Sequence, residues 1–355
     1  MKQKKASPNG LLGEYETRQA QRVAIILTGF VLMLALAVIF AALGATNTPC
    51  VDILRTLVRL ALRQELDTPQ TVILHLRLPR VVMAMLAGAG LSISGAAMQG
   101  ITRNPLVSPF TIGVSNAAAF GASLSIVFGL GILPGTEAGT VITAFLLAFL
   151  SAALVYLVSL RAGLSPETLV LTGIAINYLF SAATSLIQYF ADEHRLSAAV
   201  AWAFGSFNGA EWNEVGTTAV AVLVTGVGLY ICAPSLDLLA SGDDEVARSL
   251  GANPQRVRAV AGALSVMATA AVISFTGVIG FVGLAGPHIA RLLLGSGHRH
   301  LIPFSAVVGA ILTLTADTIG RLILAPVLIP VGIVVSFLGV PIFVNLILTR
   351  RKRGM

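Results

Sequence analysis

The sequence predicts an all-α protein that crosses a membrane about ten times. Of its 355 residues, 56% are hydrophobic and only 11% are charged, whereas about a quarter of the residues in a soluble domain carry charge. The charged residues also separate long uncharged runs, and roughly 20 apolar residues allow a helix to cross a bilayer core of about 30 Å. These observations exclude a soluble globule and indicate a polytopic helical bundle.

Most uncharged runs predict one span each, but two runs need a further argument. In the run 104–136, Pro105 and Pro109 oppose regular helix, so its span is expected from about residue 111 onward. The run 259–290 is interrupted by glycines and by Pro287, so it is expected to hold two spans. The expected spans are 23–45, 80–99, 111–130, 138–160, 167–190, 215–234, 257–278, 281–296, 302–322 and 331–349.

The basic residues predict the orientation. Lys and Arg cluster before the first span and after the last, and positive residues concentrate on cytoplasmic flanks. Both termini are therefore expected in the cytoplasm, as a tail at 1–22 and a basic tail at 350–355 around a transmembrane domain at 23–349. The segment between the first two spans opposes this rule, because its arginines would lie outside; they are Arg55, Arg59, Arg63, Arg77 and Arg80. An amphipathic interfacial helix or an acidic partner arriving from outside would each explain them.

Composition excludes several chemistries. Cys50 and Cys232 are too few for a thiolate zinc site and are expected to be packing residues. No glycine-rich loop ends in Lys-Ser or Lys-Thr, so the chain is not expected to hold nucleotide phosphates in the Walker manner. We expect no cofactor or metal on this chain, and ATP with its magnesium would need a partner. The excess of positive charge follows the membrane topology and does not indicate nucleic acid.

The largest cytoplasmic loop, 235–258, is expected to contain a short rigid helix. Ser241 with Asp244 three residues later fits a capping box, and Gly251 is a natural stop. Asn253 followed by Pro254 predicts the start of the next helix. The short helix is either a capped connector or a docking element for a cytoplasmic subunit.

Several polar residues lie within the apolar spans. Gln99 and Asn104 are costly to bury, so they either line a watery passage or cap backbone ends broken by the prolines. Ser115 and Asn116 are weaker candidates for the passage, and interhelical hydrogen bonds would also explain them. Ser94 lies in a run of small residues suited to close helix packing. Asp317 and Arg321 are four residues apart, which permits a salt bridge on one helix.

Several motifs follow one another along the chain. They are RLPR at 77–80, GAGLSISGAAMQG at 88–100, TRNPL at 102–106, GVSN at 113–116, EVARSLG at 245–251 and GPHIAR at 286–291, extended by the stretch from 316–317 through 330–332 to 339–341. In these motifs the chain resembles the permeases of ABC importers for iron-siderophores, haem and cobalamin. The resemblance covers roughly residues 50–349 in unbroken order.

The resemblance implies partners and roles for particular residues. It implies a ten-span subunit paired with a second copy or a paralogue, two cytoplasmic ATPase subunits, and an extracytoplasmic binding protein that delivers the ligand. The implied ATPase-coupling residues are Glu245, Ala247, Arg248, Ser249, Leu250 and Gly251. The implied docking residues for the binding protein are Arg55, Arg59 and Arg321. The expected pathway or gate residues are Ser94, Gln99, Asn104, Ser115 and Asn116.

The sequence therefore favours a transporter subunit of the cytoplasmic membrane rather than an enzyme. The expected cargo is a ferric siderophore or a related metal chelate, carried by alternating access, with haem or cobalamin as the alternative. A rival from another class is a secondary transporter driven by an ion gradient. That mechanism normally needs intramembrane carboxylates, and only Asp317 approaches that description.

Overall fold

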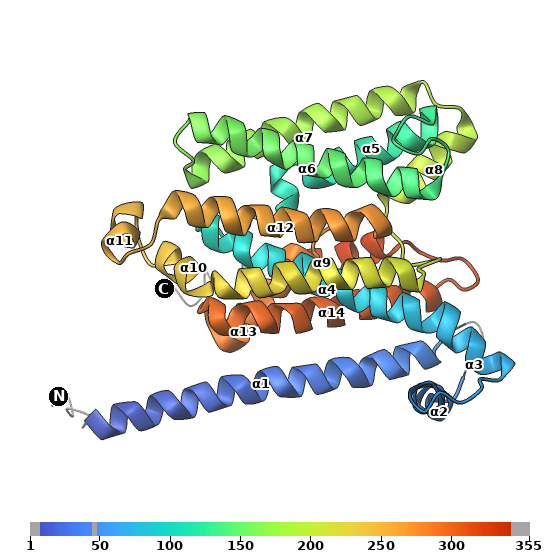
Figure 1. Ribbon diagram of the computed structural model, residues 1–355, viewed down its shortest axis with the longest axis horizontal. Helices are drawn as coiled ribbons and strands as arrows, with labels where there is room; N and C mark the ends of the chain where they lie inside the picture. Colours follow the sequence, from blue (N-terminus) through green and yellow to red (C-terminus); the bar gives the residue numbers. More distant parts are fainter. Residues whose placement is uncertain (1–7, 45–47, 342–355) are drawn as a thin grey trace.

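The computed structural model describes residues 8–44 and 48–341, and within these residues the chain is helical without β-strands (Figure 1). The helices are α1 (Pro8–Ala42), α2 (Cys50–Ala61), α3 (Thr68–Val72), the π-helix η1 (Ile73–Arg77), α4 (Leu78–Thr102), the 3-10 helix η2 (Pro109–Ile112), α5 (Val114–Phe128), α6 (Glu137–Arg161), α7 (Pro166–Tyr189), α8 (Glu193–Ala203), α9 (Trp212–Ile231), α10 (Ala233–Ala240), α11 (Asp244–Ser249), α12 (Pro254–Thr276), α13 (Val282–Leu294) and α14 (His298–Leu322). A last apolar helix covers Val331–Pro341.

The expected polytopic, all-α fold is confirmed. In the described part of the chain, seven helices are long and apolar enough to cross a membrane, and α5, α13 and Val331–Pro341 are shorter apolar helices. Together they correspond to the ten expected spans. The final expected span, 331–349, and the basic tail at 350–355 extend beyond the described residues.

Local sequence explains where the irregular segments fall. Pro109 lies in the short helix η2, and α5 begins only at Val114, as the two prolines predict. The long run 259–290 is divided where α12 ends at Gly277, whose φ of 69° is left-handed. The expectation for the cysteines is wrong for Cys50, which is exposed at the start of α2.

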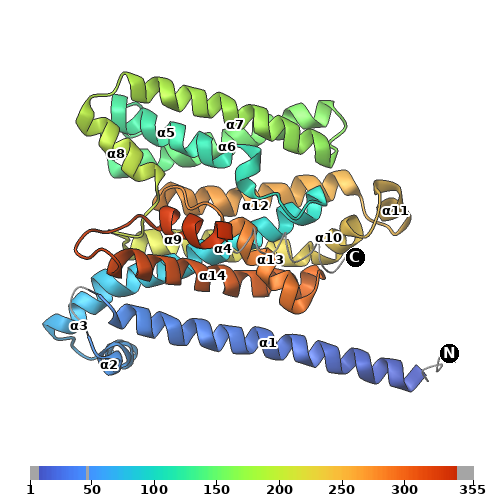
Figure 2. The same cartoon turned by 180° about the vertical axis from the view of Figure 1, so that it is seen from behind.

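Helix α4 forms the centre of the bundle. It packs against α9, α12, α13 and α14, while α5 to α8 form a group along one edge and α1 lies along the opposite edge (Figures 1 and 2). Small residues allow these close contacts: a methyl group added at Gly95 would overlap the carbonyl oxygen of Gly283 on α13. A methyl group added at Gly88 would likewise overlap the carbonyl oxygen of Gly309 on α14. Because helices in lipid associate mainly through packing, these glycines determine how closely α4 is enclosed.

The two ends of the bundle carry different short helices. The start of α1 lies at the same end as α10 and α11, whereas α2 and α3 lie at the other end (Figures 1 and 2). We call these the α11 end and the α2 end. Each end of α4 therefore lies close to one group of short helices.

Candidate functional site

Helix α11 at the α11 end contains most of the residues expected to contact an ATPase. Ala247 is buried against the bundle. Val246 and Leu250 are large apolar residues that are 46% and 57% exposed. Glu245, Arg248, Ser249 and Gly251 are exposed as well. Ala247 is thus the one residue of the expected coupling set that packs inward. The rest of the set is exposed and, together with Val246, gives a surface with two large apolar side chains among charged and polar ones.

The expected start of this helix is wrong, whereas its expected end is confirmed. Helix α10 ends at Ser241, whose hydroxyl donates a hydrogen bond to the Leu238 carbonyl instead of capping the next helix. Asp243 takes the cap position without a side-chain cap bond. Gly251, with φ 90°, terminates α11, and the Asn253 side chain accepts the Arg256 backbone N–H at the start of α12.

Asp244 is bound by arginines from two other segments, and we call these three residues the Asp244 cluster. Arg258 on α12 donates from both terminal nitrogens, at 2.7 Å to Oδ2 and 2.6 Å to Oδ1. Arg103, directly after α4, donates to Oδ1 at 2.7 Å. The Arg258 side chain is only 1% exposed, against 30% for Asp244. Its burial is compatible with its charge because the carboxylate and two backbone carbonyls satisfy it.

The electrostatics of this cluster favour an ionised aspartate. Hydrogen bonding by Arg258 lowers the pKa of Asp244 below its ordinary value, and the charges of Arg258 and Arg103 act in the same direction. Partial burial opposes this effect. A second side-chain contact at the same end joins α10 to α14, because the His298 Nδ1 lies 2.6 Å from Asp237 Oδ1.

At the α2 end, Asp317 is also shared by two arginines, and these residues form the Asp317 cluster. Arg80, near the start of α4, donates to Asp317 Oδ1 at 2.8 Å, and Arg321 donates to Oδ2 at 3.1 Å. The predicted salt bridge within α14 is therefore present, and Asp317 is only 5% exposed. Arg321 also donates to the Leu43 and Phe40 carbonyls at the end of α1.

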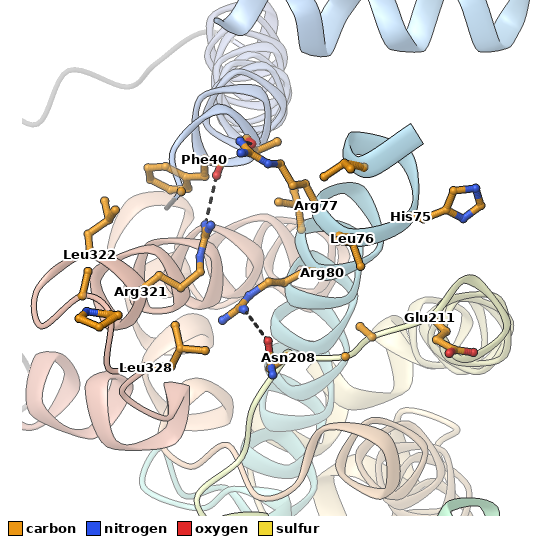
Figure 3. A pocket seen from close by; sticks show the side chains of 18 residues that line it. Phe40, His75, Leu76, Arg77, Arg80, Asn208, Glu211, Arg321, Leu322 and Leu328 are labelled. Atoms are coloured by element: carbon orange, nitrogen blue, oxygen red, sulfur yellow. Dashed lines mark hydrogen bonds between the residues drawn. The ribbon is translucent and has the colours of Figure 1, made fainter. Parts of the chain in front are cut away.

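A cavity of about 570 Å³ lies beside the Asp317 cluster. Arg77, Arg80 and Arg321 line it from different helices; Arg77 and Arg321 extend toward the end of α1, and Asn208 accepts a hydrogen bond from Arg80 (Figure 3). Arg77 donates to the Ala41 and Ala42 carbonyls. Arg77 and Arg321 thus satisfy the backbone acceptors at the C-terminus of α1, which otherwise lack partners within the helix.

The three expected docking arginines differ in accessibility. Arg55 is 66% exposed on α2, where its nearest ion-pair partner is Asp52. Arg59 is half-exposed and donates to Gln70. The Arg321 side chain is 13% exposed and is bound within the chain as described above. Helix α2 carries Arg55 and Arg59 and buries only Ile53 and Thr56. An amphipathic helix therefore stays an alternative explanation for these two arginines.

The expected pathway residues lie in different environments. Gln99 and Ser94 are buried in α4, and neither side chain has a hydrogen-bond partner in the described part of the chain. Asn104 accepts the Leu106 backbone N–H, so it caps the broken backbone beside Pro105. Asn116 donates to the Asn177 carbonyl, which is an interhelical hydrogen bond. Ser115 is buried.

The role of these five residues in a passage stays a prediction. Sequence reasoning did not connect Arg103 or Arg258 to Asp244. A usable signal was present, because Arg258 lies within the expected span 257–278, where a charged side chain needs a partner. No group of three metal-ligating side chains occurs among the residues that the structure describes.

Comparison with known proteins identifies a matching family, similar sequences and a similar structure. The model of the FecCD transport family matches residues 30–349. The chain is 42% identical over 295 residues to an ABC transporter permease of Methanocaldococcus jannaschii, covering 81% of this chain and 84% of that protein. It is 35% identical over 330 residues to the hemin transport system permease of Yersinia pestis, covering 92% and 97%. A solved structure described as an inward-facing metal-chelate type ABC transporter is similar with a TM-score of 0.81 and 34% identity, covering 92% of this chain and 99% of that one.

Proposed function

Since this chain belongs to the FecCD transport family, we propose that it is the permease subunit of an ABC importer for a ferric siderophore or a related metal chelate. In this proposal it lies in the cytoplasmic membrane with the α11 end in the cytoplasm. A partner ATPase binds α11, and an extracytoplasmic binding protein delivers the cargo to the α2 end. The chain itself catalyses no reaction.

The observation that carries the proposal is the exposed surface of α11. Val246 and Leu250 are large apolar side chains exposed outside the expected spans, on a short helix that protrudes from the bundle (Figure 1). Such residues at the centre of a charged and polar surface are typical of a protein interface. The acidic start and the basic end of α11 complement the dipole of this helix.

A second permease copy is supported by the exposed side of α7. This helix lies at the edge of the molecule (Figure 1). Tyr178 and Tyr189 are exposed on it, together with Ser181 and Ser185. Leu171, Leu179 and Leu186 are also exposed on α7, so polar and aliphatic side chains mix there, whereas the exposed side of α9 is mainly aliphatic, with Val220, Leu223, Val227 and Ile231 beside Tyr230. Tyrosine and serine suit a protein contact or a watery passage better than lipid. We propose that the passage forms between the α7 sides of two copies.

The proposed cargo is a chelate because the similar proteins are named for such cargo. The Yersinia pestis relative is named for hemin, and the similar structure is described as metal-chelate type. This chain offers no cluster of metal ligands within its described residues. The metal would therefore travel inside its chelator, with the protein contacting only the chelator.

An ion-coupled secondary transporter is less compatible with the geometry. Such a mechanism would rely on Asp317 gaining and losing an ion or proton. Asp317 is instead buried, and both of its carboxylate oxygens are bound by Arg80 and Arg321. The carboxylate is thus occupied within the chain and is poorly placed to receive a coupling ion.

The substitution Leu250→Glu tests the proposed function. It places a charge at the centre of the exposed α11 surface, so docking of an ATPase should be lost while the bundle is unaffected. We expect the variant to insert into membranes normally but to lose ATP-dependent uptake by at least about tenfold, which corresponds to roughly 1.4 kcal/mol of lost interface energy. Uptake is measured in proteoliposomes with ferric hydroxamate, ferric citrate, hemin and cobalamin as probes, after copurification with the ATPase and binding protein.

Gln255→Glu is the matched control. Gln255 is exposed at the start of α12, five positions after Leu250, so the variant adds the same charge at the same end outside α11. Its uptake should equal that of the wild type. Unchanged uptake by Leu250→Glu, or ATP-independent accumulation by the purified chain alone, would contradict the proposed function.

A further inference from the structure

Asp244 is the first residue of α11 and is also the only one of its three consecutive acidic residues with a side-chain bond in the described part of the chain. We propose that Asp244 is a positioning residue that links α11 to α12 and to the turn after α4, so that movement of α11 reaches both at once. This inference rests on the proposed docking of an ATPase on α11. It assigns to one carboxylate the transmission of that movement into the bundle.

The first branch runs through Arg258 into the core. The Arg258 guanidinium contacts two segments besides Asp244, because it donates to the Ile101 carbonyl in α4 and to the Leu164 carbonyl between α6 and α7. Its side chain is almost fully buried, so the packed surroundings prevent it from rotating away. A displacement of Asp244 must therefore displace α12, the end of α4 and the α6–α7 turn, or break the ion pair.

The second branch runs through Arg103 into the turn that follows α4. Arg103 has a left-handed backbone with φ 50° and directly precedes Asn104 and Pro105. Its Nη2 donates to Asp244, and its Nε donates to the Leu239 carbonyl on α10 at 2.6 Å. Arg103 is thus bound to both short helices of the α11 end. The segment with the predicted gate residue Asn104 is connected to α11 through this arginine.

The bonds are suited to transmit a displacement. Arg258 and Asp244 form two parallel charge-assisted hydrogen bonds, an arrangement that fixes distance and orientation together. The neighbouring carboxylates Asp243 and Glu245 are exposed and lack such bonds in the described structure. The substitutions Asp243→Asn and Asp244→Asn therefore form a matched pair, because each replaces one carboxylate with a neutral amide and changes the net charge equally.

The test compares Asp244→Asn with Asp243→Asn in proteoliposomes that contain the complete importer. The readouts are ATPase copurification, the rate of ATP hydrolysis, and the amount of hemin or ferric hydroxamate taken up per ATP hydrolysed. We expect both variants to retain the ATPase and to hydrolyse ATP. Asp244→Asn should lower uptake per ATP by about tenfold, within the range typical of coupling between distant sites, whereas Asp243→Asn should match the wild type.

The conservative variant Asp244→Glu keeps the carboxylate and should recover most of the uptake per ATP. If Asp244→Asn fails to fold, Asp244→Glu and Arg103→Lys still test the proposal. Arg103→Lys keeps the positive charge but loses the contacts of the guanidinium fork, so it should lower uptake per ATP. Equal uptake per ATP in Asp244→Asn and the wild type would overturn the inference. A proportional fall in hydrolysis and uptake would also overturn it, since that result indicates a purely structural role. A wild-type importer without any bound ATPase would instead overturn the proposed function, and the inference with it.

Discussion

Asp317 and Asp244 each bind an arginine at one end of helix α4, but they do so in different ways. Asp317 binds Arg80 near the start of α4 and lies within the 25-residue helix α14. Asp244 binds Arg103 just after α4 ends and lies on the six-residue helix α11. Each carboxylate also binds a second arginine. The chemistry of the two clusters is the same, but the elements that bear the carboxylates differ in length and in attachment.

This difference separates a fixed end from a movable end. Asp317 and Arg321 belong to one helix turn, so no relative movement between them is available. Arg77 and Arg321 also bind the last carbonyls of α1, which further secures the α2 end. Asp244 is joined to the bundle mainly by its ion pairs and by the loops on either side of α11. In the proposed function, the α11 end is therefore the place where the partner ATPase displaces the bundle.

The largest expected effect on stability comes from Asp317→Asn. The substitution leaves two nearly buried arginines without their shared carboxylate, and breaking a buried ion pair costs about 3–5 kcal/mol. The midpoint of thermal unfolding in detergent or nanodiscs should fall accordingly. Asp52→Asn is the control, because Asp52 forms an exposed pair with Arg55 and such pairs contribute about 0–1 kcal/mol. Equal effects from both substitutions would remove the contrast between a buried and an exposed pair.

A smaller, pH-dependent effect is expected at the α11 end. Folding lowers the pKa of Asp244, so the ionised carboxylate stabilises the folded state above the ordinary aspartate range, and this stabilisation is lost as the pH falls through the lowered pKa. The difference in unfolding midpoint between wild type and Asp244→Asn should correspond to about 1.5 kcal/mol at neutral pH.

This difference should stay constant down to about pH 5 and shrink as the pH falls below about 4. Thermal unfolding of the two proteins across the pH range measures it directly. A difference that instead disappeared between pH 8 and pH 6 would show that the Asp244 carboxyl is not the titrating group.

The smallest expected effect on stability comes from removing the hydrogen bond between Tyr156 and the Arg258 carbonyl. The Tyr156 hydroxyl on α6 donates to the Arg258 carbonyl at 3.0 Å, and a single hydrogen bond of this kind contributes about 0.5–1.5 kcal/mol. Tyr156→Phe should lower the unfolding midpoint slightly while uptake per ATP stays unchanged, because the ion pairs of Asp244 remain. Tyr230→Phe, at a partly exposed position on α9, should have no effect. A large loss of uptake per ATP in Tyr156→Phe would mean that α6 belongs to the transmission path.

Local rules predicted the elements well but not the partners of the charged residues. The end of α11 at Gly251 and the start of α12 at Asn253 follow from residues within one helix turn. Ser241 misled the same reasoning, because an additional helix, α10, begins at Ala233 with Pro234 in its first turn and has Ser241 as its C-cap. The pair Asp317–Arg321 was foreseeable from spacing alone. The pairs of Asp244 were not, because Arg103 lies 141 residues away in the sequence.

By itself, the sequence determined that this chain is a multi-span helical bundle with a short helix in its largest polar loop, because hydropathy, proline and glycine act over a few neighbouring residues. The family resemblance and its expected partners were likewise present in the order of the motifs. Only the tertiary structure decided which charges are buried and which carboxylate each arginine shares. Burial and ion pairing depend on distance in space, and the packing around α4 brings together residues that no local pattern connects.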